Sequence, residues 1–180
     1  MKDEKYYKSH IASVLDFPKK GINFRDITTT LEDAEAFHNC IDDMAELAKD
    51  FVFNKIVCAD ARGFLFGSAL AYKLNKAVVV ARKPNKLPRP GHSHSYSLEY
   101  GENTMLISEN SIKKGDKCLV VDDLLATGGS AVAMIELIKQ SEGTPVASIF
   151  YIELTDLKGR EAIKKGTDIP VLSLVKFEGE

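Results

Sequence analysis

The residues best suited to chemistry follow a short apolar run. Two acids, Asp122 and Asp123, are followed by a segment of small and hydroxyl-bearing residues: Ala126, Thr127, Gly128, Gly129 and Ser130. Hydroxyls and glycine amides at the start of a helix can hold a phosphate, whereas ionised carboxylates accept hydrogen bonds from hydroxyl groups. A sugar phosphate carries both groups, a phosphate for the start of the helix and hydroxyls for the carboxylates. We therefore expect Asp122 and Asp123 to face ribose hydroxyls and residues 126–130 to hold a 5′-phosphate.

Two common nucleotide-binding patterns are missing from the chain. It contains neither G-x-x-x-x-G-K-[ST], the usual motif for ATP hydrolysis, nor G-x-G-x-x-G, the usual motif for dinucleotide binding. The alternative for residues 122–130 is an ordinary turn with solvated acids. An apolar strand, two acids, a glycine pair and a helix in direct succession favour the binding site.

The elements that must position these residues follow an alternating pattern. Short runs rich in β-branched residues alternate with stretches of helical period, which predicts a mostly parallel sheet of about five strands flanked by helices. The expected strands are Lys55–Ala59, Ala77–Ala81, Cys118–Val121, Val146–Ile152 and Val171–Val175. The expected helices are Ala34–Asp50, Phe64–Leu74 and Ser130–Gln140. A further helix before Phe17 is expected on the surface, outside the core.

One segment breaks the alternation. Residues 82–97 show no apolar period and contain three prolines and a glycine, which predicts a long irregular loop. Loops of this length are often functional. Thr104–Ile107 is expected to return from the loop as a strand.

The charges are distributed unevenly along the chain. The formal net charge is −2, yet residues 61–98 carry no acid and seven cations, so the remainder sums to −9 (−2 minus +7). A chain that is not basic overall argues against a nucleic-acid binder, whereas a local cationic segment suits a small anion. With no long apolar run and a polar start, we expect a cytoplasmic protein without membrane association. The three scattered cysteines, Cys40, Cys58 and Cys118, are expected to be buried and reduced.

The stretch from Asp122 to Ser130 resembles the phosphoribosyl-diphosphate signature of the type I phosphoribosyltransferases. Other stretches are similar, in this order, to the adenine-specific members of that family: Asp16-Phe17-Pro18, Gly21 to Ile27, Arg62 to Gly67, Arg82-Lys83 with Lys86-Leu87-Pro88, Tyr96 to Gly101, and Leu157-Lys158-Gly159-Arg160. The resemblance covers nearly the whole chain. It implies one domain over residues 1–180, with an N-terminal hood over about 1–32 and a flexible catalytic loop over about 82–102.

The resemblance also implies a reaction. Adenine would displace pyrophosphate from 5-phosphoribosyl 1-diphosphate to give AMP, with Mg²⁺ held mainly by substrate and water rather than by direct protein ligands. It further implies a homodimer. Two alternatives stay open: transfer to another purine base, and a non-catalytic regulator that senses the sugar diphosphate.

Individual roles follow from the same resemblance. Phe24 would stack on adenine while the backbone of Asn23 and Arg25 reads the base edge, although Asn23 departs from the apolar residue expected there. Glu99 would accept or stabilise a proton on the base. The remaining implied residues are the pyrophosphate-binding cations Arg62, Arg82, Lys83 and Lys86, and the loop tyrosines Tyr96 and Tyr100. From the residues alone, Phe24 as a core side chain and Arg62 in a surface ion pair remain alternatives.

Overall fold

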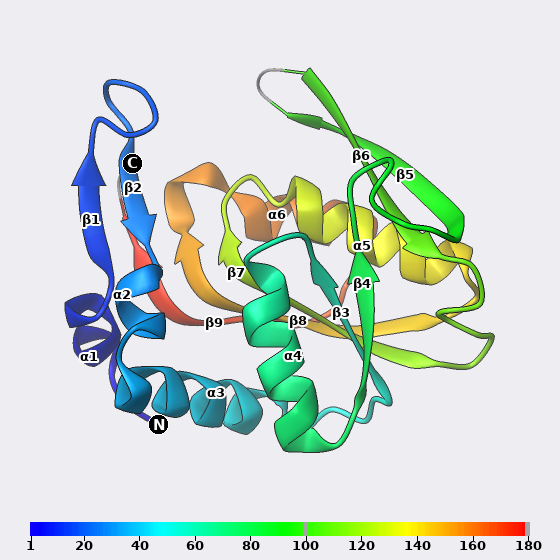
Figure 1. Ribbon diagram of the computed structural model, residues 1–180, viewed down its shortest axis with the longest axis horizontal. Coiled ribbons are helices and arrows are strands. Elements are labelled where there is room, and N and C mark those ends of the chain that lie inside the picture. The colour runs from blue at the N-terminus through cyan, green and yellow to red at the C-terminus, as the bar shows by residue number, and fades with distance from the viewer. Residues whose placement is uncertain (99–100, 179–180) are drawn as a thin grey trace.

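The computed structural model describes residues 1–98 and 101–178, and its centre is a parallel sheet of five strands in the order β4-β3-β7-β8-β9 (Figure 1). The strands are β3 (Lys55–Ala59), β4 (Ala77–Ala81), β7 (Lys117–Leu125), β8 (Thr144–Leu154) and β9 (Val171–Phe177). All five expected strands are confirmed. The last three extend beyond their expected bounds, and β7 continues through Asp122 and Asp123.

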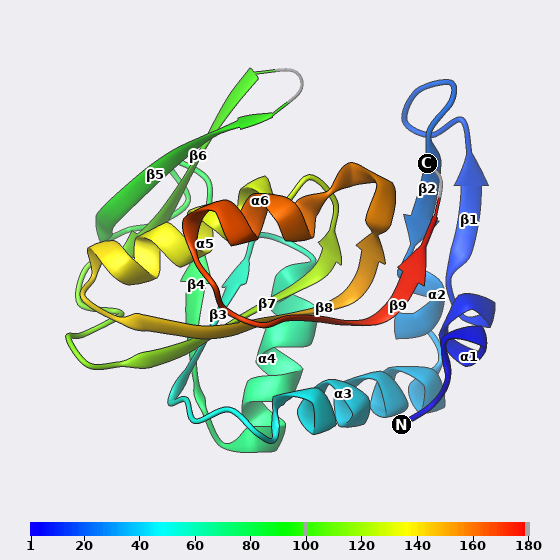
Figure 2. The same ribbon diagram turned by 180° about the vertical axis from the view of Figure 1, so that it is seen from behind.

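Helices cover both faces of the sheet. Figures 1 and 2 show α3 (Ala34–Ala48) and α4 (Gly63–Leu74) on one face and α5 (Gly129–Gln140) and α6 (Gly159–Gly166) on the other. Successive residues of a strand point to opposite faces, and β7 shows this directly. Leu119 and Val121 belong to the core on the α3–α4 side, whereas Val120 packs on the α5 side. The three expected helices are confirmed. The periodicity missed α6 and the short 3₁₀ helix η1 (Thr155–Leu157) before it.

The N-terminal segment packs against the edge of this layered core. It comprises α1 (Glu4–Ser9), an antiparallel hairpin of β1 (Ala12–Leu15) and β2 (Asn23–Asp26), and α2 (Thr28–Leu31). The expectation that the first helix lies outside the core is wrong. Tyr7 of α1 is fully buried, its ring meets Tyr151 of β8 edge-on, and its hydroxyl donates to Asp43 at 2.7 Å. Two adjacent tyrosines in a charged helix gave no apolar period, and so the sequence pattern missed this contact.

The expected long loop is largely a second hairpin. β5 (Pro90–Leu98) and β6 (Gly101–Ser108) pair antiparallel, and only residues 83–89 between β4 and β5 are irregular. The expectation of an irregular segment is therefore wrong for residues 90–97, whereas the strand over Thr104–Ile107 is confirmed. From residue 90 to residue 96, only His94 and Tyr96 are partly buried and the others are exposed, so this strand needs no apolar period. Pro90 is tolerated because it is the first residue of its strand.

The structure also bears on the composition-based expectations. All three cysteines are buried and free, as expected. Within the two described ranges, we find no helix with the length and apolarity that crossing a membrane requires.

Candidate active site

A cavity of about 260 Å³ lies at the carboxyl edge of the sheet. Two segments line it, one after β3 and one running from the end of β7 into α5: residues 59–62 and 122–131. Parallel sheets bind ligands at this edge because several strands end there together. The structure thus brings Arg62 to the same cavity as the two acids and the five residues from Ala126 to Ser130. The sequence analysis did not single out Asp60, which also lines it. Its position directly after a strand was the available signal.

The phosphate loop, residues 126–130, is built around Gly128. This residue has φ +86° and is the N-cap of α5, and no side chain in the described part of the chain caps that helix. The first amides of a helix lack intrahelical partners and carry the positive end of its dipole. The loop therefore presents unpaired donors to the cavity, as anion binding requires. Tyr96 of β5 approaches it, with its hydroxyl 3.4 Å from Ser130 Oγ.

The paired acids lie at the end of β7 and are almost completely buried. Asp122 is 8% exposed and Asp123 4%. Burial raises the pKa of Asp122 well above its ordinary value, and the adjacent Asp123 carboxylate raises it further. Gly63 packs directly on Asp122, because a methyl group in place of its hydrogen would collide with the carboxylate. The backbone thus approaches an acid of the site closely at Gly63, where a side chain would not fit.

Arg62 connects the acids to the hood. Its Nε lies 2.8 Å from Asp123 Oδ2, and its guanidinium lies 5.5 Å from the centre of the Phe24 ring. The contact with Asp123 is an ion pair by distance but lacks hydrogen-bond alignment, so that buried oxygen has no hydrogen-bond donor among the residues that the structure describes. Buried oxygens are rarely left unpaired. Asp123 therefore retains capacity to accept a hydrogen bond from a ligand.

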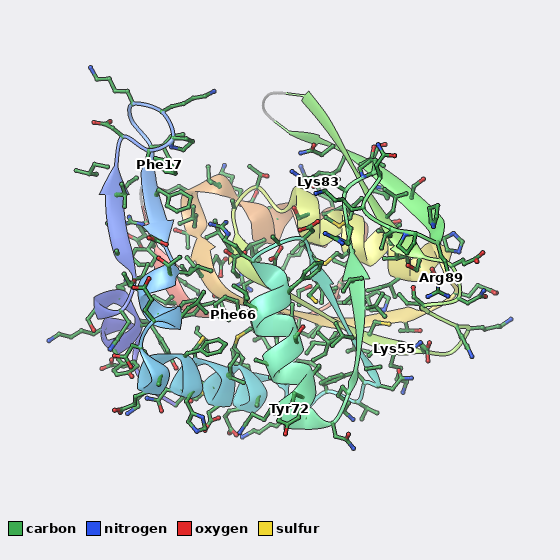
Figure 3. The ribbon with its side chains drawn as sticks, in the orientation of Figure 1. Phe17, Lys55, Phe66, Tyr72, Lys83 and Arg89 are labelled. Carbon is green, nitrogen blue, oxygen red and sulfur yellow. The ribbon has the colours of Figure 1, made fainter. Side chains whose placement is uncertain are left out.

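Phe24 lies in the hood hairpin rather than in the central core. Its ring meets that of Phe17 edge-on at 5.3 Å, and both are partly accessible to solvent. Figure 3 places Phe17 at the outer end of the hairpin. Asn23 and Arg25 flank Phe24 on β2, which pairs only with β1 among the described residues. Main-chain groups on the other edge of β2 can thus bond a ligand. The Arg25 side chain points to β9 instead, with its guanidinium 4.2 Å from the Phe177 ring.

The three expected cations after β4 lie in different surroundings. Arg82 donates from Nε to Asp60 Oδ2 at 3.1 Å, which ties it to the cavity wall. Lys83 and Lys86 are exposed and do not line the described cavity; Figure 3 shows Lys83 near the end of β4. Glu99 and Tyr100 lie outside the described residues.

Comparisons with known proteins agree with this geometry. The phosphoribosyl transferase domain family matches residues 30–171. The adenine phosphoribosyltransferase of Brachyspira hyodysenteriae is 49% identical over 170 residues, which cover 94% of this chain and 98% of that protein.

Solved structures show the same likeness in three dimensions. The adenine phosphoribosyltransferase of Thermoanaerobacter pseudethanolicus superposes with a TM-score of 0.91 at 43% identity, covering 96% of this chain and 99% of that one. The Saccharomyces cerevisiae enzyme, complexed with D-2,5-dideoxy-2,5-imino-altritol 1,6-bisphosphate and adenine, superposes with a TM-score of 0.87 at 34% identity over 96% of this chain and 98% of that one. These likenesses confirm the resemblance and the fold class that the sequence motifs indicate.

Proposed function

The chain belongs to the adenine phosphoribosyltransferases, within the phosphoribosyl transferase family, and from that premise we propose the roles of its residues in forming AMP and pyrophosphate from adenine and 5-phosphoribosyl 1-diphosphate. One observation carries the assignment of the site. An uncapped helix N-terminus and two buried acids, one with an unpaired oxygen, line the same cavity. That arrangement matches the phosphate and the hydroxyls of one sugar phosphate.

The sugar phosphate is bound by the loop and the acids. The main-chain amides and hydroxyls of residues 126–130 hold the 5′-phosphate at the start of α5. Asp122 and Asp123 accept hydrogen bonds from the ribose hydroxyls. The unpaired Oδ2 of Asp123 supports this role because a ribose hydroxyl would supply the donor that the protein does not.

Cations assist departure of the leaving group. As the bond from ribose to the diphosphate breaks, positive charge develops on the sugar and negative charge on the departing oxygens. Arg62 lines the cavity, Arg82 is bonded to Asp60 of its wall, and Lys83 and Lys86 follow on the adjoining segment. Donors aimed at charge that develops in the transition state contribute about 2.7 to 4 kcal/mol each in comparable sites.

The base is held from the hood side. Phe24 offers its ring face to adenine, and the backbone of Asn23 and Arg25 bonds the base edge. In this structure the Arg62 guanidinium lies over the Phe24 ring, 5.5 Å from its centre. If Arg62 moved to bind the diphosphate, the face of the Phe24 ring and the Asp123 carboxylate would both become free to bind substrate. Tyr96, near Ser130, and Tyr100 belong to the segment that covers the sugar.

Glu99 accepts or stabilises a proton of the purine imidazole ring, a role that rests on the family resemblance. Replacing it with Gln should lower kcat far more than it weakens binding of the sugar diphosphate. Steady-state kinetics test this, and unchanged turnover would remove Glu99 from the mechanism.

Magnesium enters with the diphosphate substrate. The cavity supplies carboxylate oxygens, which are the protein ligands that Mg²⁺ accepts, usually one or two together with substrate phosphates and water. The two acids are engaged with the ribose hydroxyls in this proposal, and the described residues offer no group of three or more metal-ligating side chains, so Mg²⁺ would be held mainly by the substrate and water. When bound, Mg²⁺ would neutralise charge on the diphosphate oxygens.

The assembly and setting of the enzyme are also part of the proposal. We propose a homodimeric cytoplasmic enzyme of purine salvage. An apolar groove between α3 and α4, beside the exposed Tyr72 (Figure 3), offers a surface that a second copy can cover. Sedimentation that shows only monomer at working concentrations would contradict the dimer.

The decisive assay incubates the protein with Mg²⁺, 5-phosphoribosyl 1-diphosphate and each of adenine, hypoxanthine and guanine, and follows nucleotides by chromatography. We expect AMP from adenine. Absence of AMP would end the proposal, preference for another base would favour a different purine substrate, and binding without turnover would favour a regulator.

A further inference from the structure

The turn that leads into α6 lies directly behind the phosphate loop. A methyl group added to Gly128 would lie 2.7 Å from the carbonyl oxygen of Gly159, and one added to Gly159 would collide with the carbonyl oxygen of Ala126. The same added methyl on Gly159 would lie 2.7 Å from Leu125 Cδ1. Backbone therefore packs on backbone here, with the Leu125 side chain beside the contact. Figure 2 shows α6 running beside α5 on one face of the sheet.

Arg160 fixes this turn to the sheet. Its Nε donates to Glu153 Oε1 at 3.0 Å and its Nη2 to Glu153 Oε2 at 2.6 Å, in the paired geometry that makes such bonds strong. Its Nη1 donates to the main-chain carbonyl of Val171, the first residue of β9. Ser173 Oγ donates to Glu153 Oε2 at 2.7 Å. One side chain thus ties the start of α6 to both β8 and β9.

The electrostatics of Glu153 agree with a fixed clamp. The residue is 5% exposed, and burial alone would raise its pKa, but the hydrogen bonds from Arg160 and Ser173 lower it below the ordinary value. The carboxylate stays ionised and keeps its hold on Arg160 through the neutral pH range.

We propose that Arg160 is a positioning residue for phosphoribosyl transfer, and that with Glu153 and Gly159 it holds the phosphate loop in the geometry that the 5′-phosphate requires. This inference rests on the proposed function. None of the three residues lines the cavity, so their effect passes through Gly128 and Ala126. Displacement of a binding group by about 1 Å can cost up to roughly 100-fold in rate.

The first test compares two crowded glycines, one behind the loop and one far from it. Gly159→Ala pushes on Ala126, whereas an added methyl on Gly143, before β8, would have Ile112 and Ile138 as its nearest neighbours. In Gly159→Ala we expect KM for 5-phosphoribosyl 1-diphosphate and the inhibition constant of ribose 5-phosphate to rise about tenfold or more. KM for adenine, extrapolated to saturating sugar diphosphate, should change less than about twofold. Gly143→Ala should leave all three constants unchanged while lowering the melting temperature.

The second test compares two ion pairs. Arg160→Met keeps an apolar stem but removes the clamp. Lys55→Met removes the ion pair, 2.7 Å long, between Lys55 at the start of β3 and Asp116 just before β7. Both should lower the melting temperature, but only Arg160→Met should raise KM for the sugar diphosphate. Arg160→Lys should not restore that KM, because a lysine cannot bridge Glu153 and Val171 in the same geometry. If Arg160→Met fails to fold, the kinetics of Gly159→Ala decide whether this turn positions the phosphate loop.

The outcomes separate this inference from the proposed function. A wild-type protein that forms no nucleotide from 5-phosphoribosyl 1-diphosphate would overturn the proposed function. An active wild type whose Gly159→Ala variant keeps its constants, or loses affinity equally for adenine and for ribose 5-phosphate, would overturn the positioning role alone.

Discussion

The two ends of β7 carry aspartates in opposite electrostatic states. Just before the strand, three donors converge on the carboxylate of Asp116: Lys55 Nζ, Asn54 Nδ2 and the main-chain N–H of Lys113. Burial alone would raise the pKa of Asp116, but these donors lower it to about 2. At the far end, burial and Asp123 raise the pKa of Asp122, and none of the described residues donates a hydrogen bond to Asp123 Oδ2.

Glycines repeat the contrast. Gly115 and Gly128 have the same φ of +86°, but a side chain on Gly115 would meet nothing within 4 Å, whereas one on Gly128 would meet the backbone of Gly159. At the amino ends of the strands, which we call the amino edge of the sheet, the protein itself supplies the donors for Asp116, and the space around Gly115 can hold a side chain. At the carboxyl edge, the buried Asp123 carboxylate has an unbonded oxygen among the described residues, and the phosphate loop is closely packed against Gly159. Such a combination is typical of ligand sites.

The glycine pair gives the largest expected effect. Gly128→Ala forces an alanine into the left-handed region and against the Gly159 carbonyl, so kcat/KM for the sugar diphosphate should fall by about 100-fold. Gly115→Ala imposes the same dihedral strain, of about 1 to 2 kcal/mol, with no collision. Steady-state kinetics with urea unfolding would show a loss of activity in the first variant alone. Equal activity in the two variants would contradict the claim that close packing at Gly128 is required for binding while the space at Gly115 is not.

The acids of the carboxyl edge give the next effect. Asp123→Asn removes a charged acceptor of the ribose hydroxyls, so kcat/KM for the sugar diphosphate should fall by about 10- to 100-fold, the value of one or two such hydrogen bonds. The free energy of unfolding should change little, because relief of the repulsion between Asp122 and its neighbour offsets loss of the ion pair with the half-exposed Arg62. A variant that loses stability while keeping its kinetics would assign Asp123 to the fold instead.

Phe24 lies on the N-terminal hairpin, outside the five-stranded sheet, and its replacement tests binding of the base separately from binding of the sugar. Removing its ring with Phe24→Leu should raise KM for adenine by about 5- to 10-fold, near the lower end of the 1 to 3 kcal/mol that base stacking contributes. The affinity for ribose 5-phosphate should not change. Phe17→Leu is the matched control, since Phe17 meets Phe24 only edge-on, and its effect on adenine should be smaller. A larger effect from Phe17 would make it the principal aromatic contact of the base.

These regions also differ in how far sequence alone predicts them. The phosphate loop and the acids are contiguous, so strand, acids, glycines and helix could be placed from one stretch. The family resemblance implies Lys83 and Lys86 together with Arg82, and of these three described cations Arg82 alone reaches the cavity wall, through Asp60. The contacts of Arg62 with Phe24, and of Arg160 with Glu153, join segments that no local pattern connects. The exposed ribbon over residues 90–97 lacked the one-sided apolar pattern by which strands are recognised.

The amino edge carries the smallest effect, which is on stability alone. In Asp116→Asn the donors lose a charged partner, and we expect the free energy of unfolding at pH 7 to fall by about 1 to 2 kcal/mol, with solvent screening keeping it below the full shift. Because the folded pKa lies below the unfolded value, the stabilisation by Asp116 is complete above about pH 4 and is lost as pH falls toward 2. Urea unfolding from pH 7 to 3 should therefore show the two proteins converging in acid, with identical KM values at neutral pH. A changed KM for the sugar diphosphate would mean that the two ends of β7 are coupled, and the division between a stabilising edge and a binding edge would fail.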